Sequence, residues 1–210
     1  MNIEKLVLVA ELFDQLIGFA SSYPSLEWGG VLIGERGKGV SRACIALFPS
    51  QKRQDRCYCE FDGSELVLIK NALNSENMRT TKWVNVGWIH THPNLTVFLS
   101  GIDRKSFEAW SALDANAVAV VIDPFSNNKK IGVFDSAYNE IQIEITKELK
   151  VSDLSNIYTF RKEVTNEYGK EYAKDKWELP IMISPNVSDR EILIEIGEPR
   201  EYPLKRLNTE

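Results

Sequence analysis

Histidine and cysteine are scarce in this sequence, and long apolar runs are missing. The 210 residues include two histidines and three cysteines. The cysteines, Cys44, Cys57 and Cys59, are too few and odd in number for a disulfide framework, so a reducing compartment is expected. No apolar run approaches the roughly 18 to 20 residues that cross a membrane, and charged residues interrupt the N-terminal segment where a secretory signal would be apolar. We therefore expect a cytoplasmic protein with no membrane partner.

An excess of positive charge is also missing. The formal net charge is -5, which argues against nucleic acid as a partner, since binding to its phosphates requires basic residues. The composition, 43% hydrophobic and 26% charged, is typical of a globular protein. A chain of 210 residues fits one domain with an appendage, or two small domains.

Up to about residue 148, strand patterns alternate with helical ones. Apolar runs bounded by turn residues predict strands at 6–10, 57–63, 83–90, 117–125, 129–136 and 139–149, and a hairpin at 29–50. Apolar residues at helical spacing predict helices at 11–23, 64–78 and 101–114. The expected fold class is α+β, with a mostly antiparallel sheet flanked by helices.

The sequence changes character after residue 148. Residues 152–178 are highly charged and compatible with a helix, and "EILIEI" at 191–196 alternates as a strand would. We therefore divide the chain into a main domain, residues 1–148, and a C-terminal extension, residues 149–210. The role of the extension stays open between a subdomain, an arm over the main domain and a docking segment.

Both histidines lie in "GWIHTHP", residues 87–93. Alternate side chains of a strand share a face, so His90 and His92 are predicted to point the same way. Two imidazoles on one face suit a divalent metal ion. For an isolated pair of this kind, two ordinary surface histidines are the simpler alternative.

A serine and an aspartate follow the histidines. Ser100 and Asp103 match a capping box at a helix start, which by itself explains both residues. Taken with the two histidines, however, Asp103 completes three ligands for a tetrahedral ion whose fourth position is open to water. That is the ligand count of a catalytic zinc site, and the nitrogen donors favour zinc over magnesium or calcium.

Such a site also needs a group that takes a proton from water. Glu27 in "SLEWGGVLIG" is the candidate, because Gly29 and Gly30 would let the backbone approach another element closely. Considered alone, Glu27 is better explained as a solvated surface glutamate.

These residues form one pattern: an upstream Glu27, then His90-Thr91-His92-Pro93, then seven residues ending on Ser100, then Asp103. The pattern resembles the JAMM (MPN+) metalloprotease family, zinc isopeptidases that remove ubiquitin and ubiquitin-like proteins. The resemblance covers about residues 5–148, where "EWGGVLIGE" is similar to the strand that carries the glutamate and "VGWIHTHP" to the ligand strand. It implies the MPN fold, a curved sheet flanked by helices.

The resemblance also implies a role for each residue. His90, His92 and Asp103 would bind one zinc ion, with a water as fourth ligand. Glu27 would act as the general acid and base, and Ser100 would hydrogen-bond the oxyanion of the tetrahedral intermediate. The further His and Cys ligands that form a second zinc site in the endosomal enzymes are not matched, so one zinc per chain is expected.

The implied activity is cleavage after the C-terminal glycine of ubiquitin or a ubiquitin-like protein, in deconjugation or precursor processing. The implied partners are that protein or its conjugates, with E1-like and E2-like enzymes of the same operon. Two alternatives stay open. One is a JAMM-type hydrolase that processes a sulfur-carrier-like protein, and the other is a non-catalytic MPN scaffold.

The resemblance suggests how a substrate would be held. In the deubiquitinases an insertion before the ligand strand pairs with the extended tail of ubiquitin, and the matching position here is residues 74–82, which are few and polar. Trp88 and Phe98 flank the ligands and are candidates for lining the cleft, with plain core residues as the alternative.

Overall fold

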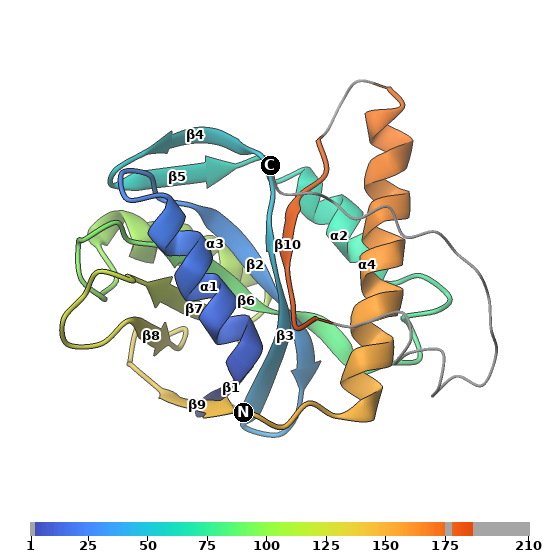
Figure 1. Cartoon of the computed structure of the whole chain (residues 1–210), viewed down its shortest axis with the longest axis horizontal. Coiled ribbons are helices and arrows are strands. Elements are labelled where there is room, and N and C mark those ends of the chain that lie inside the picture. Colours follow the sequence, from blue (N-terminus) through green and yellow to red (C-terminus); the bar gives the residue numbers. More distant parts are fainter. Residues whose placement is uncertain (1–2, 175–177, 187–210) are drawn as a thin grey trace.

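A mixed sheet organises the chain, whose computed structural model describes residues 3–174 and 178–186. The sheet has eight strands in the order β8-β7-β6-β2-β3-β1-β9, with β10 added beside β3 (Figure 1). The strands are β1 (Lys5–Val9), β2 (Gly29–Arg36), β3 (Val40–Phe48), β6 (Trp83–Thr91), β7 (Val118–Ile122), β8 (Ile131–Phe134), β9 (Gln142–Thr146) and β10 (Ile181–Ile183). A separate hairpin pairs β4 (Gln51–Asp55) with β5 (Tyr58–Phe61).

The α+β class is confirmed, but the sheet is mixed where a mostly antiparallel one was expected. β1 runs parallel to both β3 and β9, and β6 runs parallel to β7. The last pair is parallel because helix α3 (Gly101–Leu113) connects the two strands and returns the chain to the same end of the sheet. A bridge between Phe134 and Glu140 joins the regions of β8 and β9, so the sheet is nearly closed.

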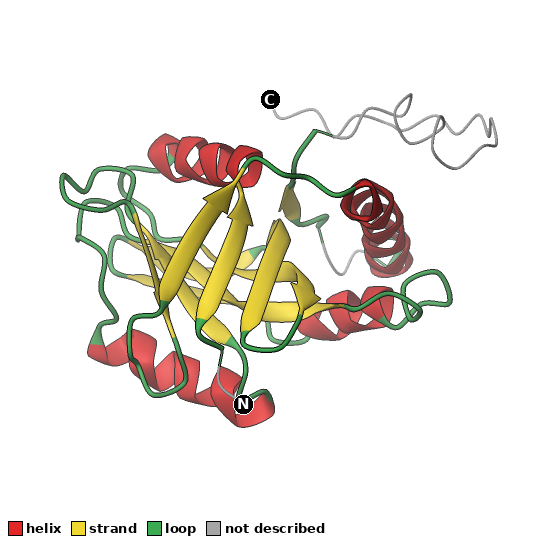
Figure 2. Cartoon of the chain, turned by 90° about the horizontal axis from the view of Figure 1, so that it is seen from below, coloured by secondary structure: helices red, strands yellow, loops and turns green. Residues whose placement is uncertain are grey.

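Helices lie on opposite sides of the strands (Figure 2). Helix α1 (Ala10–Ser22) buries Leu12, Leu16 and Ala20, which are spaced four residues apart on one stripe. These residues belong to the main core, whereas α3 covers a second cluster that includes Trp88 and Phe107. Within the described residues, no helix combines the length and apolar character that crossing a membrane requires.

The described part of the C-terminal extension packs over the main domain. Helix α4 (Val151–Tyr172) stands beside α2 (Glu65–Leu73) in Figure 1 and contributes Phe160 and Tyr168 to the main core. The Tyr168 hydroxyl donates a hydrogen bond of 2.9 Å to Glu65, and β10 pairs antiparallel with β3. The strand expected at 191–196 lies outside the described residues.

Most predicted elements are present within the described ranges, and the differences have local causes. β4 has the sequence "QKRQD", whose polar side chains carry no strand alternation, so it was not predicted. β10 was not predicted either, because its three residues are too few to show a strand pattern. The helix expected at 64–78 ends at Leu73, and residues 74–82 form turns before β6.

Candidate metal centre

The last residues of β6 bring the two histidines together at the end of the strand. Both are buried, with exposed fractions of 0% for His90 and 1% for His92. Their Nε2 atoms are 3.1 Å apart, so the predicted shared face is confirmed. The ring of His90 stacks on Trp88, with centroids 4.2 Å apart and an interplanar angle of 16°. The alternative of two ordinary surface histidines is therefore wrong.

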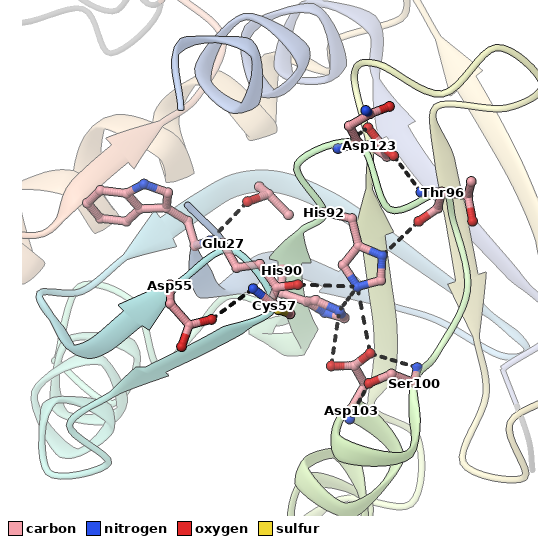
Figure 3. Close-up of polar contacts among 12 residues, drawn as sticks. Glu27, Asp55, Cys57, His90, His92, Thr96, Ser100, Asp103 and Asp123 are labelled. Atoms are coloured by element: carbon pink, nitrogen blue, oxygen red, sulfur yellow. Dashed lines mark hydrogen bonds and ion pairs between the residues drawn. The ribbon is translucent and has the colours of Figure 1, made fainter. Parts of the chain in front are cut away.

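Helix α3 presents its first turn to the histidines. The Ser100 amide donates to Asp103 Oδ2 at 2.7 Å, and the Asp103 amide donates to Ser100 Oγ at 3.2 Å, which is the predicted capping box. The same Asp103 carboxylate places Oδ1 3.5 Å from Nε2 of His90. Asp103 therefore caps helix α3 and also belongs to the cluster, because the cap fixes its carboxylate where the histidines point (Figure 3).

Glu27 lies beside the cluster and is buried, with 3% of its surface exposed. Its Oε1 is 3.8 Å from Nε2 of His92. The register of β2 against β6, with Gly29 opposite His90, brings it there. Gly30 permits the packing, because a Cβ at this position would lie 2.3 Å from the Leu47 carbonyl oxygen. A solvated surface glutamate is therefore excluded.

The β4–β5 hairpin fixes the backbone of Glu27, a function that the sequence did not indicate. The Glu27 amide donates to the Asp55 carbonyl at 2.9 Å, and the Gln54 side-chain amide donates to the Glu27 carbonyl at 2.7 Å. Burial raises the pKa of the Glu27 carboxyl to about 8, and His92 only partly offsets this effect. A bound cation would lower that pKa and favour the carboxylate.

The charges of the three clustered residues depend on one another. Burial lowers the pKa of His90. Burial acts on His92 in the same direction, but its bonds to Asp103 and Thr96 outweigh it and raise the pKa. Burial would raise the pKa of Asp103, yet contacts with both histidines and Ser100 lower it well below its usual range. Asp103 is therefore held as a carboxylate, the form that binds a cation.

The three donor groups fit a tetrahedral zinc ion. Ligand atoms bonded at about 2.0 to 2.1 Å around such an ion are separated by about 3.3 Å. The two Nε2 atoms lie 3.1 Å apart, and Asp103 oxygens lie 3.5 Å from His90 and 3.7 Å from His92. One ligand atom from each of the three residues lies within 4.8 Å of the others. The cluster could hold a metal ion.

A loop after β6 sets the direction of the His92 ring. Nδ1 of His92 is 2.7 Å from the Thr96 carbonyl oxygen, so this nitrogen carries the hydrogen and Nε2 keeps its lone pair for the cluster. The buried Asp123 carboxylate contacts the amide of Thr96 from the other side (Figure 3). Neither contact was predictable from the sequence, because an aspartate before a proline at a strand end is typical of an ordinary turn and a backbone carbonyl has no sequence signal.

An apolar pocket of about 220 Å³ lies beside the cluster, between the β4–β5 hairpin, β6 and α3. Its lining residues are Cys59, Glu60, Phe61, Gly63, Leu66, Trp88, Ser106, Ala109, Trp110 and Leu113. Trp88 lines this pocket, supports the ring of His90 and is also a buried residue of the second apolar cluster. Phe98 is 43% exposed and contacts the ring of His92 instead.

The segment 74–82 lies away from the cluster. It precedes β6, whose far end carries the histidines, and its Asn77 donates to Glu163 of α4 at 2.8 Å. The hairpin that borders the cluster is β4–β5, residues 51–61. The position expected to meet a substrate tail therefore contacts α4, because it adjoins the first residue of β6 and the histidines lie at the other end of that strand.

Comparison with known sequences finds relatives that are named as deubiquitinases or ubiquitin thioesterases. The Lys-63-specific deubiquitinase BRCC36 of Camponotus floridanus is 27% identical over 169 residues, which are 72% of this chain and 64% of that protein. The AMSH-like ubiquitin thioesterase 2 of Arabidopsis thaliana is 26% identical over 109 residues, 52% of this chain and 45% of that protein. The chain thus spans less than two thirds of the length of these relatives.

Structural comparison finds the same fold in a solution structure of a protein from Desulfitobacterium hafniense. The TM-score is 0.55 at 19% identity, and the match covers 70% of this chain and 97% of that one. The family described as JAB1/Mov34/MPN/PAD-1 ubiquitin protease matches residues 3–133, which is more than half of the sequence. The resemblance seen in the sequence is confirmed, and the chain belongs to the JAB1/Mov34/MPN/PAD-1 family.

Proposed function

We propose that this protein is a zinc-dependent peptidase or isopeptidase that cleaves after the C-terminal glycine of ubiquitin or a ubiquitin-like protein. The observation that carries the proposal is the buried group of His90, His92 and Asp103, with the Glu27 carboxylate 3.8 Å from His92. Relatives named as deubiquitinases support the substrate class. Enzymes that activate and conjugate such a modifier, encoded in the same operon, are the further partners that we propose.

Zinc at these three residues would polarise the scissile carbonyl and lower the pKa of a bound water from about 15.7 toward about 7. His90 and His92 supply neutral nitrogen donors, which zinc accepts and magnesium or calcium disfavours. Asp103 supplies the negative charge, and its cap bond to Ser100 keeps the carboxylate in place. The surrounding burial removes competing water from the ligands.

Glu27 is the residue that we assign to proton transfer. Its carboxylate takes the proton of the attacking water and then gives a proton to the departing amine. Two contacts with the β4–β5 hairpin hold its backbone, so the carboxylate keeps its distance from His92. The pKa of about 8 applies to the metal-free cluster. A bound cation would lower it and give the carboxylate that accepts the proton of the water.

Ser100 is the residue that we assign to the oxyanion. Its Oγ accepts the Asp103 amide hydrogen at 3.2 Å as part of the cap. A hydroxyl that accepts one bond still has its own hydrogen to donate. That hydrogen could meet negative charge that develops on the carbonyl oxygen during attack.

An extended tail suits the space beside the cluster. Among the described residues, β5 pairs with β4 alone, so its outer edge is open to a peptide backbone. The apolar pocket bordered by Phe61, Trp88 and Trp110 could accept one apolar side chain of that tail. Glycine is favoured next to the bond that is cut, because the walls formed by β6 and α3 would collide with a larger residue.

The test is direct cleavage by zinc-loaded protein. Two probes would be used: ubiquitin with a short C-terminal extension, and two ubiquitin molecules joined through a lysine. We expect intact mass to place the cut after the terminal glycine, and Glu27→Gln to leave both probes whole. Zinc-loaded protein that cuts neither probe but cuts a sulfur-carrier-like protein after its glycine would favour the carrier alternative, and failure to take up zinc would contradict the proposal altogether.

A further inference from the structure

The loop between β6 and α3 adopts a conformation that few residue types favour. Asn94 has φ 64° and Thr96 has φ 72°, both in the left-handed region. Left-handed backbone is unfavourable for a residue with a Cβ, and threonine, which is β-branched, is a poor occupant. Such a conformation persists where surrounding contacts impose it.

Asp123 supplies those contacts from the end of β7. It is fully buried, with an exposed fraction of 0%. Its Oδ2 accepts the Thr96 amide hydrogen at 2.7 Å, and its Oδ1 accepts the amide hydrogens of Asn94 at 3.3 Å and Phe125 at 2.9 Å. One carboxylate therefore ties the loop to the strand next to β6.

The bond between Asp123 and the Thr96 amide affects the cluster, because the carbonyl of the same Thr96 contacts His92. The Thr96 carbonyl accepts the hydrogen on Nδ1 of His92 at 2.7 Å. This bond fixes both the ring direction and the nitrogen that stays free for the cluster. His90 differs, since its Nδ1 has no hydrogen-bond partner within the described structure and its ring is held by stacking on Trp88.

We propose that Asp123 is a positioning residue that holds the Thr96 carbonyl against His92 and so sets the affinity of the site for zinc. This inference rests on the proposed function, because it requires that His92 binds the ion. In this proposal Asp123, which lies outside the cluster, positions His92 and does not position His90. Loosening the loop should therefore disturb His92 directly, and His90 only through its contact with the His92 ring.

The chain offers a control at a second turn, where the aspartate is less buried than Asp123. Asp135 Oδ1 accepts the amide hydrogens of Ala137 and Asn139, each at 2.9 Å, around Tyr138, which has φ 63°. The Asp135→Asn change removes the same kind of carboxylate from a left-handed turn that contacts no cluster residue. It reports the effect of weakening a turn by itself.

The experiment compares Asp123→Asn with Asp135→Asn in zinc affinity and in histidine NMR. In the wild type both oxygens of Asp123 accept amide hydrogens. Asparagine has one oxygen and one NH2 group, so one of these amide hydrogens would face a donor. We expect Asp123→Asn to weaken zinc binding by about 10- to 100-fold, the usual cost of losing support for a metal ligand. We also expect the proton on His92 Nδ1 to exchange faster, and the His92 signals to shift more than those of His90, whose ring contacts His92. With two histidines in the chain, assignment is simple.

Two outcomes overturn the inference alone. One is a folded, zinc-binding Asp123→Asn protein with affinity within about twofold of wild type and unchanged His92 signals. The other is equal weakening by the Asp135→Asn control, which would indicate general destabilisation. A wild type that binds no zinc contradicts the proposed function itself.

A measurement on the wild type keeps the test independent of how the variant folds. In the zinc-loaded wild type, the Thr96 amide and the His92 Nδ1 proton should exchange slowly with solvent, because each forms a bond of 2.7 Å. Rapid exchange of the Thr96 amide in that protein would show that Asp123 does not hold the loop, and it would overturn the inference.

Discussion

Two buried carboxyl groups in this protein have pKa values that are shifted in opposite directions. Asp103, at the metal centre, is 7% exposed, and Glu65, between α2 and α4, is 1% exposed. Contacts with two histidines and with Ser100 lower the pKa of Asp103 despite its burial. Burial raises the pKa of Glu65 to about 7, and the hydrogen bond that the Tyr168 hydroxyl donates offsets this rise only in part.

The state of a buried acid therefore has to be inferred from the groups that contact it. Burial disfavours the charged form of any carboxyl, so it does not by itself indicate a functional site. Donors that converge on the carboxylate decide the outcome. Asp103 is kept ionised and ready for a cation, whereas Glu65 is a hydrogen-bonded structural acid that joins the extension to the main domain.

The largest expected effect comes from making the same change at both acids. Asp103→Asn removes one zinc ligand and the negative charge of the cluster, so we expect loss of bound zinc and of all cleavage. Glu65→Gln should retain one zinc per chain and full activity. Elemental analysis of the purified proteins checks both expectations, and His92→Ala should behave like Asp103→Asn. Stoichiometric zinc in Asp103→Asn would remove this residue from the proposed ligand set.

The next effect separates chemistry from binding at a third buried acid. Glu27→Gln should keep zinc, because Glu27 lies outside the ligand group. It should slow cleavage by roughly 10²- to 10⁴-fold, the contribution usual for a general acid and base. Cleavage rates under conditions where zinc is saturating provide the measurement. A variant that cleaves at the wild-type rate would exclude Glu27 as the group that transfers the proton.

A smaller effect is expected at the cap of α3. Ser100→Ala removes both the cap acceptor and the proposed oxyanion donor. We expect cleavage to slow on the order of 10²-fold, as for other oxyanion donors. Thermal unfolding measures the cap separately, and its loss should cost about 1 kcal/mol. If stability falls by that amount while the cleavage rate is unchanged, Ser100 is a cap residue and takes no part in the reaction.

The sequence predicts those site residues that stand in a local pattern and also have suitable chemistry. His90 and His92 are two residues apart on one strand, so strand alternation alone places them on one face. Asp103 follows from the capping box, which is also a local pattern. The predicted helix and strand around these residues are α3 and β6, since each has a strong periodic signal.

The rest of the site depends on contacts between distant segments. Glu27 is buried because β2 pairs with β6 across more than sixty residues and because the polar hairpin β4–β5 covers it. The roles of Thr96 and Asp123 require a left-handed loop and a neighbouring strand, neither of which carries a periodic pattern. The parallel pairing of β1 with β9 has no local sequence signal either, and for this reason a mostly antiparallel sheet was expected.

The smallest predicted effect tests the state of Glu65 through the pH dependence of stability. The pKa of this carboxyl is about 7 in the folded protein, compared with 4.5 for an unperturbed glutamate. Between these values the folded chain holds a proton that the unfolded chain has released, so the wild type loses stability as pH rises through this window. Below pH 4.5 both states are protonated, and above about pH 7 the loss is complete.

Glutamine keeps an oxygen for the Tyr168 hydroxyl and cannot ionise, so Glu65→Gln should not show this loss. Its stability relative to wild type should rise by about 2 kcal/mol between pH 5 and pH 8, and other titrating groups cancel in the difference. Denaturant unfolding of both metal-free proteins across this range provides the measurement. A difference that stays constant with pH would mean that Glu65 is ionised in the folded state, and the contrast between the two buried acids would no longer hold.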